Sequence, residues 1–243
     1  LFMAHSLARK QSKVKSFRIG FLPYMVVLAV LIGLLLAQPD LGSALTLAIV
    51  AVAILLVAGT RLCYLASIGL IALPFLYFMV MNVDYRRRRI MAFLNPWEDP
   101  SDTGFQIIQS WIAFGNGGAF GQGLGESKQK LFYLPEAHTD FVFAVTAEEL
   151  GLVGVVCILS MYMLLVWRAF KIAINAARAE LQFGAYLAFG IGFWMGLQAL
   201  INIGVNMGAL PTKGLTLPLM SYGGSSILIT LVALVGILMS KRF

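Results

Sequence analysis

Six apolar stretches, each long enough to cross a lipid bilayer as a helix, constrain this chain more than any other feature. A hydrocarbon core of about 30 Å takes about 20 helical residues. Lipid admits only helices or closed barrels, and the stretches lack the alternation of barrel strands. The sequence therefore predicts an all-α, polytopic transmembrane helix bundle. The spans are expected at about 20–38, 41–59, 62–83, 141–167, 183–207 and 224–240.

Composition supports this class and excludes others. Only 12% of the residues are charged and 60% are hydrophobic, whereas a soluble domain has roughly 25% charged residues. The net charge of +7 comes from basic residues that flank the spans, where anionic lipid headgroups satisfy them. We therefore expect contact with membrane lipid and no nucleic-acid role. With two cysteines and two histidines, neither a disulfide framework nor a metal cluster is expected.

The basic residues also set the orientation. Five of them and no acid lie within residues 9–18, before the first span, which places the amino-terminal end in the cytoplasm. Six spans then put Lys241 and Arg242 inside and the large loop 84–140 outside. The run Arg86, Arg87, Arg88 and Arg89 in that loop opposes the positive-inside rule, so we interpret it as a candidate anion site. The chain starts at Leu1 without a signal-peptide pattern, and we expect it to begin within a longer protein.

Three parts are visible in the loop 84–140. The prolines and acids of Asn95–Pro100 predict an ordered turn. The helical spacing of Phe105, Ile108, Trp111 and Ile112 predicts a short amphipathic helix at the outer interface, with its apolar face in lipid or protein. Six glycines within 115–125 match no nucleotide-binding loop. They indicate either flexibility or a backbone that seats a substrate.

Titratable residues precede the fourth span. Glu136, His138 and Asp140 lie directly before the apolar run from Phe141. Either Thr139 or Asp140 caps the helix, or Asp140 is a general base that accepts a proton from a substrate hydroxyl, and both roles are compatible. Glu148 and Glu149 follow along the same helix. Because they are adjacent, at most one of them points into the bundle.

Polar residues also mark the last two spans. Gln198, Asn202 and Asn206 recur every four residues and share one face, where they join helices or contact a substrate. The segment 210–218 is too apolar for an ordinary loop and too broken for a helix, which predicts a re-entrant segment. The following residues expose backbone N–H groups that, with Lys213, suit an anion. The candidates there are Ser221, Gly223 and Gly224.

Several of these motifs together resemble the SEDS family of shape, elongation, division and sporulation proteins, and its division members in particular. The motifs are Gln38–Gly42, Asn95–Pro100, Leu134–Phe141, Glu148–Gly151 and Pro211–Ser226. The resemblance runs along the whole chain. Family members have about ten spans, so residues 1–243 are expected to be a single but incomplete SEDS domain that corresponds to the carboxyl-terminal six.

The resemblance implies a peptidoglycan glycosyltransferase of cell division. Such an enzyme polymerises lipid II at the outer face of the bacterial cytoplasmic membrane, working with a class B penicillin-binding transpeptidase and other division proteins. It also implies that Asp140 is the catalytic acid. Asp40 matches another family motif, although a cap on the second span, with Ser43 three residues on, explains it equally well.

Joining two lipid-linked sugars needs a base for the attacking hydroxyl and positive charge for the departing diphosphate. We expect Lys213 or the Arg86–Arg89 run to hold that diphosphate. A divalent cation such as Mg²⁺ beside it is compatible with this chemistry, although the sequence shows no ligand set. Further candidates for substrate contact are Glu136, His138, Asp40, Ser221, Gly223 and Gly224.

Two other functions compete with this one. A flippase of the lipid-linked precursor would place ionisable residues within its spans, but five of the six spans contain none. A scaffold that only recruits a synthase would not need the Asp140 carboxylate.

Overall fold

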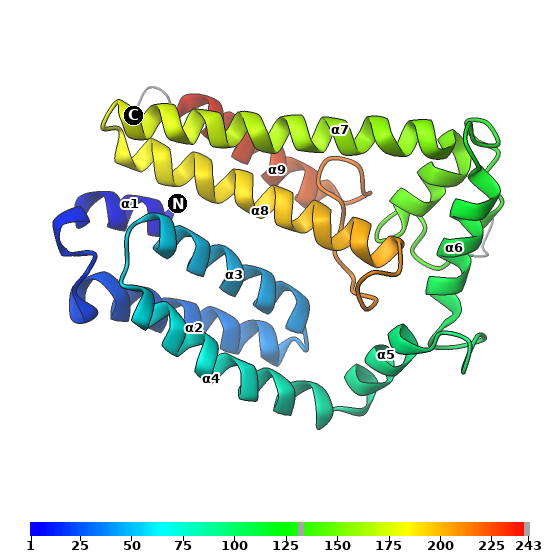
Figure 1. The fold of residues 1–243 in the computed structure, drawn as a ribbon, viewed down its shortest axis with the longest axis horizontal. Helices are drawn as coiled ribbons and strands as arrows, with labels where there is room; N and C mark the ends of the chain where they lie inside the picture. Colours follow the sequence, from blue (N-terminus) through cyan, green and yellow to red (C-terminus); the bar gives the residue numbers. More distant parts are fainter. Residues whose placement is uncertain (131–133, 241–243) are drawn as a thin grey trace. The chain divides into compact units, whose positions relative to one another are not determined.

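A computed structural model describes residues 1–130 and 134–240 of the chain (Figure 1). Helices form at all six predicted spans, and no strand occurs within the described residues, so the predicted fold class is confirmed. The main helices are α1 (Phe2–Arg9), α2 (Leu22–Ala37), α3 (Leu41–Val57), α4 (Leu62–Met81), α5 (Asp84–Leu94), α6 (Phe105–Gly117), α7 (Val142–Arg178), α8 (Gln182–Asn206) and α9 (Gly224–Met239).

Length and hydropathy make four helical segments suitable for crossing a membrane. They are Phe17–Ala37, which joins a π-helical turn to α2, and the helices α4, α7 and α8. Helices α3 and α9 are apolar but shorter, with 17 and 16 residues, so a crossing by these two stays a prediction. The predicted cytoplasmic pair Lys241 and Arg242 lies outside the described residues.

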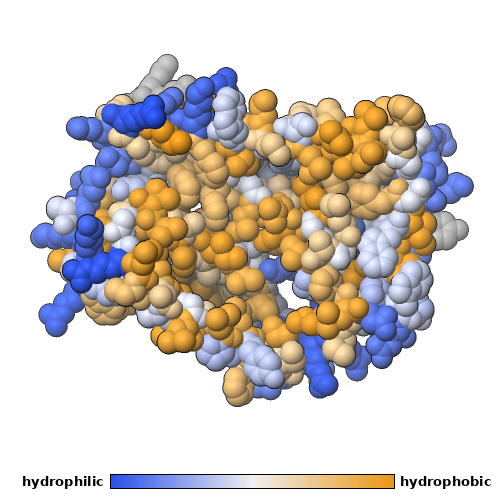
Figure 2. Space-filling model, viewed as in Figure 1, coloured by the Kyte–Doolittle hydropathy of each residue, from blue (hydrophilic) through white to orange (hydrophobic). Residues whose placement is uncertain are grey.

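Apolar side chains remain exposed along these helices, as expected for surfaces that meet lipid. Helix α4 has no buried residue, and Leu70, Ile71 and Leu73 are each at least 70% exposed. Figure 2 shows hydrophobic residues over most of the visible face and hydrophilic residues gathered at its margins. A soluble protein rarely exposes apolar patches of this extent.

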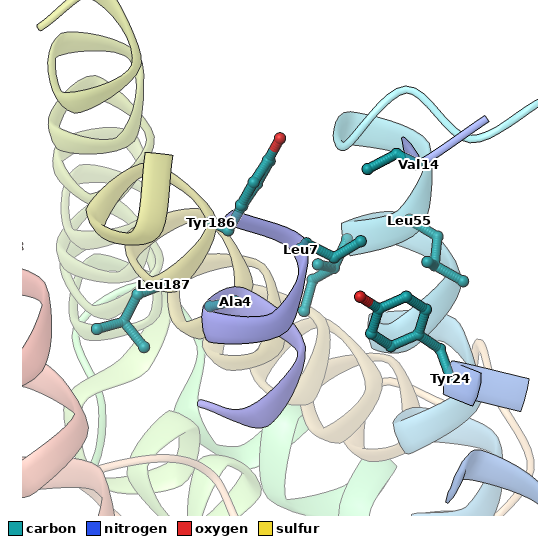
Figure 3. Packing of buried hydrophobic residues seen from close by; sticks show 8 residues of the cluster. Ala4, Leu7, Val14, Tyr24, Leu55, Tyr186 and Leu187 are labelled. Atoms are coloured by element: carbon teal, nitrogen blue, oxygen red, sulfur yellow. The ribbon is translucent and has the colours of Figure 1, made fainter. Parts of the chain in front are cut away.

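The chain forms two compact units, and α4, α7, α8 and α9 contribute residues to both. The first unit comprises Leu1–Phe75, Leu165–Leu197 and the residues from Leu231 on. Its core brings α1 together with α2, α3 and α8 (Figure 3). The core residues are Ala4, Leu7, Val14, Tyr24, Ile54, Leu55, Tyr186 and Leu187. The Tyr24 hydroxyl donates a hydrogen bond of 2.9 Å to Ser6, which ties α1 to α2.

The second unit comprises Leu76–Leu164 and Gln198–Thr230. The predicted amphipathic helix forms as α6, and its face with Ile107, Ile108 and Ala113 is buried in protein. Of the four residues predicted on the apolar face, Ile108 is buried and Phe105 is partly buried, whereas Trp111 and Ile112 are exposed. The indole N–H of Trp111 donates to the main-chain oxygen of Met207 at 3.1 Å. Packing of α6 against the start of α7 and the end of α8 places these three elements around residues 134–141.

Helix α7 is interrupted at Gly151, which has φ 63° and ψ −163°. The break divides α7 into a short first segment, 142–150, and a long second segment, 152–178. The glycine-rich residues 115–125 of the outer loop lie against this break and form backbone hydrogen bonds with it. Plain flexibility therefore does not describe these glycines.

Candidate active site

A tight turn carries the predicted catalytic residue to the start of α7. The main-chain N–H groups of Thr139, Asp140 and Phe141 all point at the main-chain oxygen of Glu136, at 3.1, 3.1 and 3.2 Å. Glu136 itself has a positive φ of 57°. Ala137 and Phe141 are buried in the core with α6 and α8, which holds the turn in place. Glu136 and His138 are exposed, and Asp140 is half-buried.

Two asparagines of α8 hold the backbone of Asp140. The side-chain amides of Asn202 and Asn206 each donate a hydrogen bond of 2.9 Å to the main-chain oxygen of Asp140. The amide oxygen of Asn206 also accepts from the N–H of Ala144 at 3.0 Å, in the first turn of α7. The cap on this N–H thus comes from Asn206, in place of the Thr139 or Asp140 side chain that the sequence predicted.

Gln198, Asn202 and Asn206, the polar stripe of α8, also fix the irregular segment 207–223 beside the turn. Gln198 donates to the main-chain oxygen of Thr216 at 2.9 Å, and Asn202 donates to that of Leu215 at 2.6 Å. Gln198, Asn202 and Asn206 are all buried. The expectation that these amides join helices is met where Asn206 accepts from the N–H of Ala144 in α7. Their other main-chain partners outside α8 are the oxygens of Asp140, Leu215 and Thr216, which lie in non-helical segments.

Ser221 and Tyr222 complete the connection to the turn. The buried Ser221 hydroxyl accepts from the N–H of Leu217 at 2.6 Å and donates to the main-chain oxygen of Thr139. The N–H of Tyr222 donates to the main-chain oxygen of His138 at 2.9 Å. Ser221 is therefore used to hold two segments together. Of the neighbouring candidates, Gly223 is partly buried and Gly224 is exposed at the start of α9.

The carboxylate of Asp140 has an environment that suits a base. Burial, and to a smaller extent the negative charge of Glu136, raises the pKa of Asp140 to about 6. The positive charge of Arg89 opposes this increase. A base is most effective when its pKa lies near the working pH. Gly214 leaves room beside this carboxylate, because a Cβ atom at that position would lie 3.1 Å from Oδ2 of Asp140.

The four arginines of α5 fall into three environments. Arg86 is buried and donates to the main-chain oxygen of Met79 at 3.0 Å and to the Tyr85 hydroxyl at 2.9 Å. Arg89 is the arginine whose charge acts on Asp140. Arg87 and Arg88 line an open cavity of about 410 Å³ that residues of the predicted turn 95–100 also line. The other residues of that cavity are Asp84, Met91, Ala92, Asn95, Glu98, Asp99 and Thr103.

The remaining candidates are placed as follows. Lys213 lies in the segment 207–223 and directly precedes Gly214, which borders the Asp140 carboxylate. Asp40 belongs to the other unit, where its side chain accepts from the N–H of Ser43 at 2.9 Å and caps α3. Among residues 1–130 and 134–240, no group of three or more potential ligands is placed to hold a metal ion.

Two features of the site were not predicted. Gly214 lies within a quoted motif, but its contact with the Asp140 carboxylate depends on the path of an irregular segment. Glu148 is completely buried and accepts three hydrogen bonds, whereas its neighbour Glu149 forms an ion pair of 2.8 Å with Lys130. Only one of the adjacent acids, Glu148, points inward, as expected.

The fold and the site define a class: a multi-pass helical membrane protein that presents a carboxylate of raised pKa at the entrance of a spanning helix. Comparison with known families shows to which family within this class the chain belongs. A sequence model described as "Cell cycle protein", which represents FtsW, RodA and SpoVE, matches residues 1–242. The chain belongs to this family, whose members are proteins of the bacterial inner membrane.

Two relatives show how close the similarity is. The chain is 61% identical over 240 residues to a probable peptidoglycan glycosyltransferase FtsW of Geobacter sulfurreducens, covering 99% of the chain and 63% of that protein. It is 48% identical over 234 residues to the probable FtsW of Coxiella burnetii, covering 96% of the chain and 63% of that protein. The chain thus spans less than two thirds of the length of these curated relatives.

Solved structures agree with the sequence comparison. One is described as the structural coordination of polymerization and crosslinking by a peptidoglycan synthase complex. It is 34% identical with a TM-score of 0.73, covering 99% of this chain and 67% of the other. The crystal structure of the rod shape determining protein RodA of Thermus thermophilus is 32% identical with a TM-score of 0.64, covering 99% and 62%.

Proposed function

We propose that this chain is the carboxyl-terminal part of a peptidoglycan glycosyltransferase that polymerises lipid II at the outer face of the cytoplasmic membrane during cell division. The observation that carries the proposal is the Asp140 carboxylate. Its main chain is held by Asn202 and Asn206, its side chain is half-buried, and its pKa is raised to about 6. The names of the FtsW relatives support the same activity.

In the proposed reaction, Asp140 accepts the proton of the attacking sugar hydroxyl. The hydroxyl oxygen forms a bond to the anomeric carbon of the second lipid-linked sugar. The bond between that carbon and the diphosphate breaks, and the diphosphate leaves with the electron pair. A carboxylate with a pKa of about 6 is mostly ionised at neutral pH and is a stronger base than an unperturbed aspartate.

Positive charge is needed where the diphosphate departs. Of the basic candidates, Lys213 and Arg89 are favoured. Lys213 adjoins Gly214, which borders the Asp140 carboxylate, and Arg89 acts electrostatically on that carboxylate. Arg86 already donates to Met79 and Tyr85, while Arg87 and Arg88 line another cavity. A divalent cation such as Mg²⁺ would add to the positive charge there.

A class B penicillin-binding transpeptidase is the proposed partner, because a polymerised strand must be crosslinked. The description of one similar structure names polymerization and crosslinking in a single peptidoglycan synthase complex. The partner, lipid II and other division proteins are proposed for the complete protein, of which this chain is a part.

The proposal is tested with Asp140→Asn in the complete protein, reconstituted with its partner in membranes that present lipid II on the active side. We expect polymer formation to fall by a factor of at least about 100, because the amide cannot accept the proton. Asp102→Asn is the matched control, since Asp102 is exposed. Because no translocation is needed in this assay, loss of polymer excludes a pure flippase and a scaffold. Wild-type turnover by Asp140→Asn would overturn the assignment.

A further inference from the structure

The first segment of α7 is held at its carboxyl-terminal end by the outer loop. At the Gly151 break, two N–H groups of α7 leave the helical pattern and donate to the loop: Leu152 to the oxygen of Gly118 at 2.9 Å, and Val153 to that of Ala119 at 3.2 Å. Two helix carbonyls accept from the loop in return. Glu148 accepts from the N–H of Gln122 at 3.0 Å, and Glu149 accepts from that of Gly123 at 3.1 Å.

Three glycines make this contact possible, and we call them the glycine clamp: Gly117, Gly121 and Gly151. A Cβ at Gly117 would lie 2.1 Å from the oxygen of Ala147, and one at Gly121 would lie 2.1 Å from the oxygen of Glu149. A Cβ at Gly151 would lie 2.3 Å from the nitrogen of Gly121. Gly121 and Gly151 also have positive φ angles of 78° and 63°, which other residues adopt only at a cost.

The buried Glu148 carboxylate also binds the loop 84–140, through hydrogen bonds from its residues. Its side chain is 0% exposed and accepts from the Asn116 amide at 3.2 Å, the Ser127 hydroxyl at 2.5 Å and the N–H of Gln129 at 3.2 Å. A buried carboxylate is costly unless hydrogen bonds satisfy it. The three donors come from α6 and the residues that follow the glycine-rich segment, so Glu148 draws the loop onto the first segment of α7.

The segment 142–150 is therefore held at both ends. Asn206 binds its start, through the main-chain oxygen of Asp140 and the N–H of Ala144. Glu148 and the glycine clamp bind its end. The break at Gly151 separates this short segment from the long remainder of α7.

We propose that Glu148 and the glycine clamp are positioning elements for Asp140, which set the placement of the carboxylate without contacting the substrate. This inference rests on the proposed function of Asp140. A misplacement of about 1 Å in a catalytic group can cost about 100-fold in rate. Damage to the clamp is thus expected to lower turnover even though Gly151 follows Asp140 by about three turns of helix.

The test uses four variants of the complete protein with its partner: Gly121→Ala, Glu148→Ala, Glu148→Gln and the control Gly115→Ala. Gly115 belongs to the same glycine-rich segment, but a Cβ there meets nothing within 4 Å. For each variant, kcat and KM for lipid II are measured across pH, together with the hydrogen exchange of the amides of residues 142–150.

We expect Gly121→Ala and Glu148→Ala to reduce kcat by about 10- to 100-fold. KM should stay within about threefold, and exchange in 142–150 should be faster. Glu148→Gln should retain more activity than Glu148→Ala, because an amide oxygen still accepts from Ser127 and Gln129 while the Asn116 amide can rotate. Its activity should still rise through pH 6 as in the wild type. Gly115→Ala should behave as the wild type.

Two results would overturn the proposal. Unchanged kcat and exchange in Gly121→Ala and Glu148→Ala would show that the clamp does not position Asp140. Equal decreases of kcat in Glu148→Gln and Glu148→Ala, with a residual activity that no longer rises through pH 6, would make Glu148 a proton-transfer group instead. If the wild type itself forms no polymer, the proposed function fails, and the exchange of residues 142–150 then decides separately whether the clamp holds this segment.

Discussion

The side chain of Asn206 donates a hydrogen bond of 2.9 Å to the main-chain oxygen of Asp140 while its amide oxygen caps the N–H of Ala144. Asn206 is 0% exposed. One amide on α8 therefore fixes both the residue that carries the candidate base and the first turn of the helix that follows. Asn202 and Asn206 bind only the main-chain oxygen of Asp140, so these two bonds leave its carboxylate available for the proposed proton transfer.

Replacement of Asn206 by leucine, which has a similar size, should destabilise the protein and reduce polymerisation. The substitution leaves the buried N–H of Ala144 without its acceptor, and a buried polar group without a partner costs about 1–3 kcal/mol. The measurements are the midpoint of thermal unfolding in detergent and the rate of lipid II polymerisation. Asn175→Leu, at an exposed position of α7, is the control. An Asn206→Leu variant equal to the control in both would refute the anchoring role.

Gly214→Ala should reduce activity with little effect on stability. The new Cβ would lie 3.1 Å from Oδ2 of Asp140, which is closer than an ordinary van der Waals contact, so it crowds the space that the attacking hydroxyl needs. Gly69→Ala in α4 is a suitable control, since a Cβ at Gly69 meets nothing within 4 Å. We expect a decrease in kcat/KM of about tenfold or more with an unchanged unfolding midpoint, given the cost of small displacements at reacting groups. Equal activities of the two variants would contradict the placement of Gly214.

The basic candidates should separate by substitution with glutamine. Lys213→Gln is expected to lower kcat/KM by about 10- to 100-fold, because a hydrogen bond to a charged group contributes about 1.5–3 kcal/mol. Arg88→Gln should have less than about a threefold effect, since Arg88 faces the cavity with Asp84, Glu98 and Asp99. Steady-state polymerisation by the complete protein measures both. A larger loss in Arg88→Gln than in Lys213→Gln would move the proposed diphosphate site to that cavity.

Patterns that depend on spacing were predictable from the sequence. The six helices follow from the length of apolar runs, and α6 follows from the helical spacing of Phe105, Ile108, Trp111 and Ile112. The shared face of Gln198, Asn202 and Asn206 follows from their spacing of four. The partners of these amides were not predictable, because they are main-chain atoms of Asp140, Leu215 and Thr216, brought near by irregular segments.

The different roles of similar residues were also not predictable. Four consecutive arginines look alike in the sequence, but the rotation of α5 buries Arg86 and turns Arg87 and Arg88 toward a cavity. Glycines 117 and 121 resemble Gly115 in sequence. They differ from Gly115 because α7 near the Gly151 break packs against them and leaves no space for a Cβ at Gly117 or Gly121.

The central claim, that ionisation of Asp140 controls polymerisation, predicts how the pH dependence responds to its neighbours. The active form is the carboxylate, so kcat/KM should rise with pH through about 6 in the wild type. Glu136→Gln removes a negative charge, stabilises the carboxylate and lowers the pKa of Asp140. Arg89→Gln removes a positive charge and raises that pKa.

The most direct measurement is therefore the pH profile of kcat/KM for lipid II in the wild type, Glu136→Gln and Arg89→Gln. Glu136→Gln keeps an oxygen to accept from the Thr139 hydroxyl, as Glu136 does at 2.7 Å, so its effect is mainly one of charge. We expect the midpoint of the rise to move to lower pH in Glu136→Gln and to higher pH in Arg89→Gln. Midpoints that stay in place, or that move in the same direction in both variants, would contradict the central claim.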